Sequence, residues 1–220
     1  MANDLTNSAI CDILSLFGIP TNTIQNIWHQ HIEKKLIESK DIFFDEIDQG
    51  NFGNIGSDDK VSVLHRYLQA AMNGAARINL RLLAKAINSL ANGEKLIKPI
   101  YANKFNRYAQ VLENISVEEI HLIASMYEYR KNAQPPHIQT TRNGIEYKND
   151  FLHNFSKHYC YKNKISEKQY ISMCSALLRT GLVYPNTYIR GVAYDLSPFF
   201  DEIIELIDFQ DALNKEGYIG

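Results

Sequence analysis

The sequence is poor in the residues that mark several large classes of protein. Only three of its 220 residues are cysteine, and their irregular spacing (Cys11, Cys160, Cys174) fits neither a disulfide scaffold nor a zinc site. Six prolines and eleven glycines are too few for a fibrous or low-complexity chain. No apolar run approaches the roughly 18 residues that span a membrane, and the first residues lack a signal-peptide pattern. We therefore expect a cytoplasmic protein that makes no contact with membranes.

The chain does contain enough apolar residues for a large folded core. Hydrophobic residues make up 45% of the sequence, and a chain of this length can bury about 70% of its unfolded surface. Apolar residues recur at helical spacing in four segments, which are residues 4–17, 24–47, 57–92 and 104–112. The third segment predicts one long helix, and the glycine- and asparagine-rich residues 50–56 predict a loop before it. These segments predict a helical N-terminal domain over residues 1–112.

The predicted long helix carries two further patterns. Small residues at 70, 71, 74 and 75 would let another backbone approach closely, since a glycine inside a helix needs compensation. Arg77, Arg81 and Lys85 share one face of the helix, and Arg66 precedes them. We interpret these cations as a solvated face, and the alternative is an anion-binding stripe.

Helix ends after residue 112 carry clear capping signals. Ser116 and Glu119 are spaced as a capping box, and the helix that they begin ends near Lys131. A short helix is expected over residues 150–159. Ser166 begins another helix, whose apolar residues are all expected inside: Tyr170, Ile171, Met173, Cys174, Leu177 and Leu178. Gly181 is predicted to end this helix in a left-handed conformation.

Strand-forming residues follow this stop. Residues 182–184 and 191–196 favour two strands joined by a turn, and Ser197 followed by Pro198 begins a closing helix. The predicted fold class is therefore mainly α, with a second domain over residues 113–220 that contains a two-stranded β-hairpin.

Two stretches around the expected strands are distinctive. They read Leu177-Leu178-Arg179-Thr180-Gly181-Leu182-Val183 and Gly191-Val192-Ala193-Tyr194-Asp195-Leu196-Ser197-Pro198-Phe199-Phe200. They resemble the turn after the recognition helix, and the step that leaves the wing, in winged-helix regulators of the multiple-drug-resistance type. The resemblance covers about residues 116–207 of the chain. It implies a recognition helix from Ser166 to Arg179 and a wing from Tyr184 to Arg190.

Charge is distributed unevenly along the chain. Residues 130–190 carry ten basic and three acidic side chains, a balance of +7, and residues 191–220 carry one basic and seven acidic, a balance of −6. A basic block attracts polyanions, unless the acidic tail folds over it and neutralises it. The expected recognition helix has few side chains suited to base edges, so contacts to phosphates are expected to dominate. The predicted nucleic-acid-binding residues are Lys157, Lys162, Lys164, Lys168, Gln169, Ser172, Arg179, Tyr188 and Arg190.

Four stretches of the chain resemble another group of proteins. They are Phe17-Gly18-Ile19-Pro20, Arg66-Tyr67-Leu68-Gln69-Ala70-Ala71, Gly74-Ala75-Ala76-Arg77-Ile78-Asn79-Leu80-Arg81 and Ser116-Val117-Glu118-Glu119-Ile120. They are similar to uncharacterised bacterial helical proteins of the abortive-infection-alpha type. This resemblance implies a bacterial protein with a link to phage defence.

Catalytic and metal-binding patterns are weak in this sequence. Cys160 lies near His153 and His158, but two flanking tyrosines favour a packed thiol over a nucleophile. Asp41, Asp45 and Asp48 share a helix face, which favours a solvated acidic surface over a cation site. We expect no cofactor, no metal and no enzymatic activity. A hydrolase would need a pocket with convergent titratable groups, which no motif predicts.

The leading hypothesis is a non-enzymatic regulatory protein that contacts nucleic acid through a basic winged helix. Tyrosines among the cations of this block can stack on unpaired bases, so single-stranded targets are included. The alternative is a protein–protein interaction scaffold, in which the winged helix binds a partner protein or a second copy of the chain.

Overall fold

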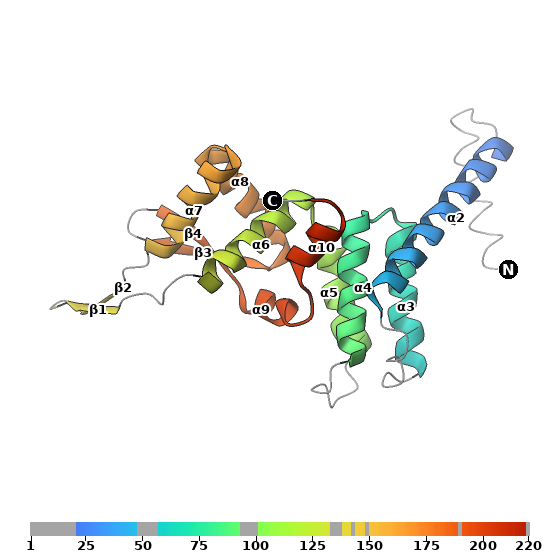
Figure 1. Cartoon of the computed structure of the whole chain (residues 1–220), viewed down its shortest axis with the longest axis horizontal. Helices are drawn as coiled ribbons and strands as arrows, with labels where there is room; N and C mark the ends of the chain where they lie inside the picture. Colours follow the sequence, from blue (N-terminus) through green and yellow to red (C-terminus); the bar gives the residue numbers. More distant parts are fainter. Residues whose placement is uncertain are drawn as a thin grey trace.

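The computed structural model describes residues 21–47, 57–92, 101–132, 138–141, 144–147, 150–188 and 191–218. Its elements in chain order are α2 (Thr21–Glu46), α3 (Ser57–Met72), α4 (Arg77–Asn92), α5 (Tyr101–Leu112), α6 (Val117–Asn132), β1 (Ile138–Thr141), β2 (Gly144–Tyr147), α7 (Asp150–Asn163), α8 (Glu167–Leu177), the 3-10 turn η2 (Leu178–Thr180), β3 (Val183–Tyr188), β4 (Gly191–Leu196), α9 (Pro198–Ile204) and α10 (Phe209–Lys215). The described chain is mainly helical with an antiparallel hairpin near its C-terminal end, which confirms the predicted fold class (Figure 1).

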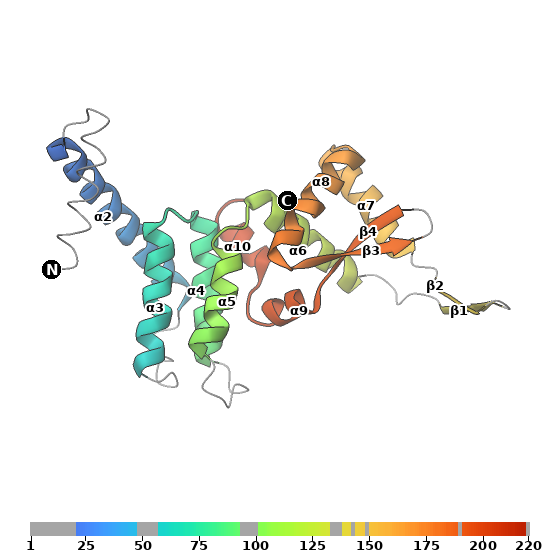
Figure 2. The ribbon, with the colours of Figure 1, turned by 180° about the vertical axis from the view of Figure 1, so that it is seen from behind.

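Helices α2 to α5 form a bundle at one end of the molecule. α3, α4 and α5 lie side by side, and the C-terminal half of α2 packs across α3 and α4 (Figures 1 and 2). Tyr67, Phe105 and Tyr108 are fully buried between these helices. The Tyr67 hydroxyl donates a hydrogen bond to the Ser39 carbonyl over 2.7 Å, so the buried polar atom is satisfied and α2 is held on α3.

The predicted long helix over residues 57–92 is wrong, because the chain turns at Gly74. The φ of Gly74 is +85°, a left-handed conformation that glycine adopts without steric cost. Its N–H donates to the Ala71 carbonyl (3.0 Å) and the Ala75 N–H donates to the Ala70 carbonyl (3.0 Å). This Schellman pattern ends α3 at Met72 and lets α4 return beside it. Gly74 therefore makes a turn, and not the close contact between helices that the small residues suggested.

The capping signals of the second half are confirmed. The Ser116 N–H donates to the Glu119 carboxylate (2.9 Å) and the Glu119 N–H donates to the Ser116 hydroxyl (3.2 Å), which completes the capping box of α6. Gly181 has a φ of +71° and ends the turn after α8. Ser197 accepts a hydrogen bond from the Phe200 N–H at the start of α9. Local side-chain chemistry alone therefore located these helix ends.

Helix α8 is less buried than its apolar residues predicted. Tyr170, Cys174 and Leu177 are buried, but Ile171 and Leu178 are 41% and 39% exposed. The predicted burial of these two side chains is wrong, because both lie about a quarter of a turn away from the buried face of the helix.

The strands and the last helix complete the second half. β3 pairs with β4 in a register that runs from Val183 opposite Leu196 to Tyr188 opposite Gly191. The hairpin β1–β2 lies between α6 and α7, where the sequence analysis predicts no element. Helix α10 is also absent from the predicted elements; it packs against α4 and α6, between the bundle and the second half (Figure 1).

The buried residues form one cluster that reaches from Ile42 to Leu213. Both halves contribute to it, and the boundary between residues 112 and 113 stays a prediction. The helix predicted over residues 4–17 and the loop predicted over 50–56 lie outside the described residues. Among the helices that the structure describes, none is both long and apolar enough to cross a membrane.

Candidate nucleic-acid interface

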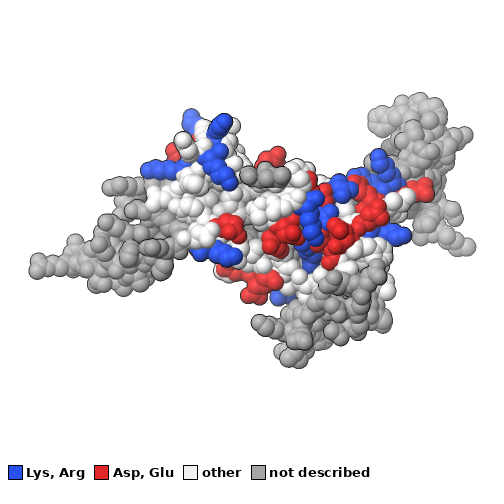
Figure 3. Space-filling view, in the orientation of Figure 1, with Lys and Arg blue, Asp and Glu red and all other residues white. Residues whose placement is uncertain are grey.

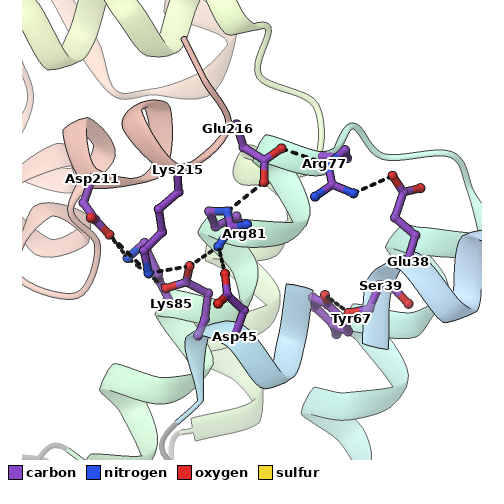
Figure 4. Close-up of polar contacts among 11 residues, drawn as sticks. Glu38, Ser39, Asp45, Tyr67, Arg77, Arg81, Lys85, Asp211, Lys215 and Glu216 are labelled. Atoms are coloured by element: carbon purple, nitrogen blue, oxygen red, sulfur yellow. Dashed lines mark hydrogen bonds and ion pairs between the residues drawn. The ribbon is translucent and has the colours of Figure 1, made fainter. Parts of the chain in front are cut away.

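The basic side chains of the molecule fall into two groups with different surroundings. The first group lies on α4, where Arg77, Arg81 and Lys85 follow one another at one-turn spacing. These side chains point toward carboxylates from α2 and from the C-terminal region after α9 (Figure 4). We call the cations and their carboxylate partners the α4 network; its members are Glu38, Asp45, Glu46, Arg77, Arg81, Lys85, Asp211, Lys215 and Glu216.

Arg81 is the centre of the α4 network. Its side chain is only 6% exposed, and it pairs with Glu46, with Glu216 (2.8 Å) and with Asp45 (2.5 Å). Glu46 is 3% exposed and also accepts from Lys85 (2.9 Å) and Lys215 (3.0 Å). Buried charges need such partners, because an unpaired buried charge is very costly.

In the α4 network the pKa of the Glu46 carboxyl is lowered and the pKa of the ammonium group of Lys85 is raised, as expected when opposite charges stabilise each other. Burial alone would raise the pKa of the Glu46 carboxyl, but hydrogen bonds from Lys85, Lys215 and Arg81 outweigh it and lower the pKa. Burial likewise opposes the charged form of Lys85, yet Asp211 and Glu46 raise the pKa of its ammonium group. The charged forms of Glu46 and Lys85 therefore stabilise each other.

The interpretation of Arg81 from the sequence is wrong as a result. Arg81 is neither solvated nor open to an external anion, because carboxylates already surround it. Asp41 and Asp45 are exposed, as the predicted solvated acidic surface requires, but Asp45 also pairs with Arg81, and Asp48 lies outside the described residues. The Arg66 guanidinium pairs with Glu113 (2.5 Å), which is not a member of the α4 network.

Acidic side chains of the C-terminal region form ion pairs in the α4 network, and few of them pair with the basic block. Asp211 and Glu216 pair with cations of α4. Within the described residues, one side chain of the basic block, Arg130, pairs with an acidic residue of this region, Asp201. Among the described cations, the alternative in which the acidic tail neutralises the basic block of residues 130–190 is therefore supported at Arg130 and not at the lysines of residues 157–168.

The second group of cations lies on α7, α8 and the turn that joins them. Lys157, Lys162, Lys164 and Lys168 are all exposed, and none forms an ion pair with another residue in the part of the chain that the structure describes. We call these four residues the lysine face. Basic side chains gather over α7 and α8, whereas blue and red atoms are interleaved over α2, α4 and α10 (Figure 3).

Aromatic packing positions the lysine face. The rings of Phe155 and Tyr159 on α7 contact each other and the ring of Tyr170 on α8, with centroids 5.6 to 6.2 Å apart. All three side chains are buried, so they fix the two helices against each other. Lys157 lies about half a turn around α7 from this buried side, which directs it toward solvent.

The turn between α7 and α8 has the same hydrogen bonds as the turn at Gly74. The Lys164 N–H donates to the Tyr161 carbonyl (3.3 Å) and the Ile165 N–H donates to the Cys160 carbonyl (3.1 Å). Lys164 has a φ of +53° and is the one non-glycine residue with positive φ among those described. A lysine thus occupies a conformation that usually selects glycine.

Helix α8 contributes fewer free side chains than predicted. Lys168 and Ser172 are exposed one turn apart, on the side of α8 opposite the buried Tyr170 and Cys174. The side-chain oxygen of Gln169 accepts from the Ser166 N–H (2.8 Å) in the capping box of this helix. Gln169 therefore has a structural role at the start of α8.

Arg179 also has a structural role that the sequence analysis missed. Its guanidinium forms a bidentate pair with Glu119, which is 8% exposed, and donates to the Asn114 carbonyl over 3.0 Å. Burial would raise the pKa of Glu119, but hydrogen bonds from Arg179 and from the Ser116 N–H lower it. This pair ties the end of α8 to the start of α6, and it occupies the guanidinium that was predicted to contact nucleic acid.

The remaining predicted residues lie at the tip of the β3–β4 hairpin. Tyr188 ends β3, but its side chain and Arg190 lie outside the described residues. A further residue, Tyr161, is 88% exposed on α7 beside the lysine face. It follows Lys157 by four residues, a spacing that the sequence already contained.

The described residues hold no group of three or more metal-ligating side chains. Burial and the nearby Glu167 raise the pKa of the Cys160 thiol, which is the opposite of what a nucleophilic cysteine needs. His158 packs its ring against Tyr129, with centroids 5.8 Å apart. Comparison with protein-family models, with curated proteins and with solved structures finds no match to this chain.

Proposed function

We propose that the chain is a non-enzymatic, cytoplasmic regulatory protein that binds nucleic acid through the lysine face. The observation that carries this proposal is the contrast in pairing. Four exposed lysines on adjoining helices have no acidic partner among the described residues, whereas the cations of α4 are all paired. Free lysines can release the counterions of a phosphate backbone, which favours binding.

The order of elements supports a winged helix as the framework for this surface. α6, α7 and α8 precede the hairpin β3–β4, and α9 follows it. In a winged helix, α8 would be the helix that faces the nucleic acid and the hairpin would be the wing. The resemblance of residues 177–183 and 191–200 to winged-helix regulators supports the same arrangement.

The side chains of this surface favour contacts to phosphates over reading of bases. Lysine ammonium groups position a backbone, and base readers such as arginine or asparagine are lacking on the exposed side of α8, which presents Lys168 and Ser172. We therefore expect little sequence preference.

Fluorescence anisotropy with labelled mixed-sequence DNA, measured across a salt series, tests the proposal. The variant Lys162→Glu/Lys168→Glu removes two members of the lysine face, and Lys34→Glu/Lys40→Glu makes the same change in charge on exposed lysines of α2. We expect the first variant to lose affinity and the dependence of log K on log salt to become shallower by about 0.7 to 0.9 for each phosphate that the variant no longer neutralises. The second variant should bind like the unmodified protein. Equal effects of both variants, or no binding at low salt, would refute the proposal.

A second function is favoured by one observation. Ile171 on α8 and Leu178 at the start of η2 lie seven residues apart on one side of the helical segment, and both are exposed. An apolar edge on this helix suits a protein–protein scaffold that binds a partner or a second copy. Sedimentation at high salt distinguishes the two, because an apolar interface persists where salt screens the attraction between lysines and phosphates. The link to phage defence, which the resemblance of the first half implies, belongs to either function.

A further inference from the structure

Tyr161 has a larger exposed fraction than any other large apolar or aromatic residue that the structure describes. It is 88% exposed, whereas Tyr159 on the same helix is 5% exposed and Tyr170 on α8 is 3% exposed. Its ring makes no hydrogen bond or ring contact with any other described residue. The buried rings of this region build the core between α7 and α8, and Tyr161 takes no part in it.

The surroundings of Tyr161 are cationic. Lys157 lies one turn before it on the same side of α7, Lys162 is its neighbour, and Lys164 follows in the turn. A flat aromatic surface is thus placed among three ammonium groups that have no acidic partner among the described residues. This combination suits a ligand that carries both negative charge and flat apolar faces.

The conformation of Lys164 adds a second observation. The equivalent positions in two other helix-ending turns of the molecule are Gly74 and Gly217, which have φ of +85° and +77°. Lys164 keeps the same geometry at a φ of +53°, although a lysine there is strained. Such conformations cluster at ligand-binding sites, and this one lies three residues after Tyr161 on an exposed turn.

We infer that Tyr161 stacks on an unpaired base while the lysine face holds the flanking phosphates, so that the ligand is a single-stranded nucleic acid. In a duplex the base faces are covered by their neighbours, and a tyrosine on a helix surface has nothing to stack on. In a single strand every base has a free face, and stacking is tolerant of sequence. This inference rests on the proposed function and adds to it the class of nucleic acid.

Anisotropy with four labelled probes of equal length tests the inference. They are oligothymidylate, its duplex with oligoadenylate, an abasic strand with the same phosphates, and oligouridylate. The unmodified protein should bind oligothymidylate more tightly than the duplex or the abasic strand. Comparison of the affinities for oligouridylate and oligothymidylate shows whether the protein prefers RNA or DNA.

Two substitutions test the role of the Tyr161 ring, and a third at Tyr218 serves as a control. Tyr161→Ala should weaken binding of oligothymidylate about 5- to 140-fold and leave binding of the abasic strand unchanged. Tyr161→Phe should bind like the unmodified protein, because it keeps the ring. Tyr218→Ala removes another exposed tyrosine, which is 41% exposed near the C-terminal end, and should also have no effect. Because Tyr161 is exposed, the two Tyr161 variants should keep the melting temperature of the unmodified protein.

Fluorescence gives an independent readout of stacking. A tryptophan at this position, Tyr161→Trp, should be quenched by oligothymidylate and not by the abasic strand. Loss of binding in Lys162→Glu/Lys168→Glu together with unchanged binding in Tyr161→Ala would overturn this inference and leave the proposed function intact. An equal loss of duplex and single-strand binding in Tyr161→Ala would overturn it as well. Absence of salt-dependent binding to every probe would overturn the proposed function itself.

Discussion

The α4 network and the lysine face use the same kinds of side chain in opposite ways. In the α4 network Arg81 and Lys85 are buried or half-buried, and all four cations pair with carboxylates from α2 or the C-terminal region. On the lysine face they are exposed and have no acidic partner in the described part of the chain. The number of cations in a segment therefore does not decide whether an anion can reach them. Their burial and the carboxylates that the fold brings beside them do.

The physical reason lies in the cost of removing a charge from water. Arg81 can be 6% exposed only because several carboxylates replace the water that it loses. Lys162 and Lys168 keep their water, so a phosphate can approach them without breaking an internal pair. The α4 network thus links the C-terminal helix to α2 and α4, whereas the lysine face forms no ion pair with the described residues.

Substitution of Arg81 should have the largest effect on stability. Arg81→Ala leaves Glu46 and Glu216 buried with one cation fewer, and we expect the free energy of unfolding to fall by about 3–5 kcal/mol. The melting temperature should fall by on the order of 10 °C. Urea titration followed by circular dichroism measures both the loss and the folded fraction.

The matched control for Arg81 comes from the lysine face. Lys168→Ala removes an exposed cation without a described partner, and we expect its unfolding free energy to change by less than about 0.5 kcal/mol. Nucleic-acid affinity should respond in the reverse order, with a loss for Lys168→Ala and none for folded Arg81→Ala. If the two variants had equal unfolding free energies, Arg81 would contribute no more to stability than an exposed lysine, and the proposed structural role of the α4 network would be wrong.

Protonation of the carboxyls of the α4 network at low pH should lower the free energy of unfolding. The pKa of Glu38, Asp45, Glu46 and Asp211 is lowered in the folded protein, so these carboxyls stabilise it above their unfolded pKa of about 4. This stabilisation is lost as the pH falls through the lower, folded values. We expect the free energy of unfolding to decrease steadily below about pH 4.

Glu46→Gln tests the assignment of this pH dependence. The variant cannot titrate at position 46, so its unfolding free energy should change by up to about 1.4 kcal/mol less per pH unit in the acid range. Urea titrations at neutral and acidic pH provide the two slopes. Identical slopes for the variant and the unmodified protein would show that Glu46 does not contribute to acid unfolding.

The sequence predicted those parts of the fold that depend on neighbouring residues. The capping box of Ser116 and Glu119, the left-handed Gly181 and the start of α9 at Ser197 all involve partners within three residues. The break at Gly74 was missed because apolar spacing continues in phase from α3 into α4. Helical periodicity cannot distinguish one long helix from two helices joined by a tight turn.

The distribution of charge partners could not be predicted from the sequence. Lys215 and Glu46 are 169 residues apart and meet only because α10 packs on α4. The same is true of Arg179 and Glu119, which are 60 residues apart. The lysines of the candidate site were predicted from the basic block and from the resemblance to a winged helix. The same two criteria selected Arg179, whose partner on α6 the sequence does not reveal.

The smallest effect is expected at Lys164, where stability and binding should move in opposite directions. Lys164→Gly relieves the left-handed strain and should raise the unfolding free energy by about 0.5 kcal/mol, after the greater freedom of glycine in the unfolded chain is subtracted. It also removes one cation of the lysine face and should weaken nucleic-acid binding. Lys164→Ala separates the two causes, because it loses the charge and keeps the strain.

Gly74→Ala provides the reciprocal change at the turn between α3 and α4. Space is open around a Cβ at Gly74, so any destabilisation reports the backbone strain alone, and nucleic-acid binding should be unaffected. A Lys164→Gly variant that is both less stable and equally able to bind would show that the turn at Lys164 is an ordinary structural feature and that the strain serves no ligand.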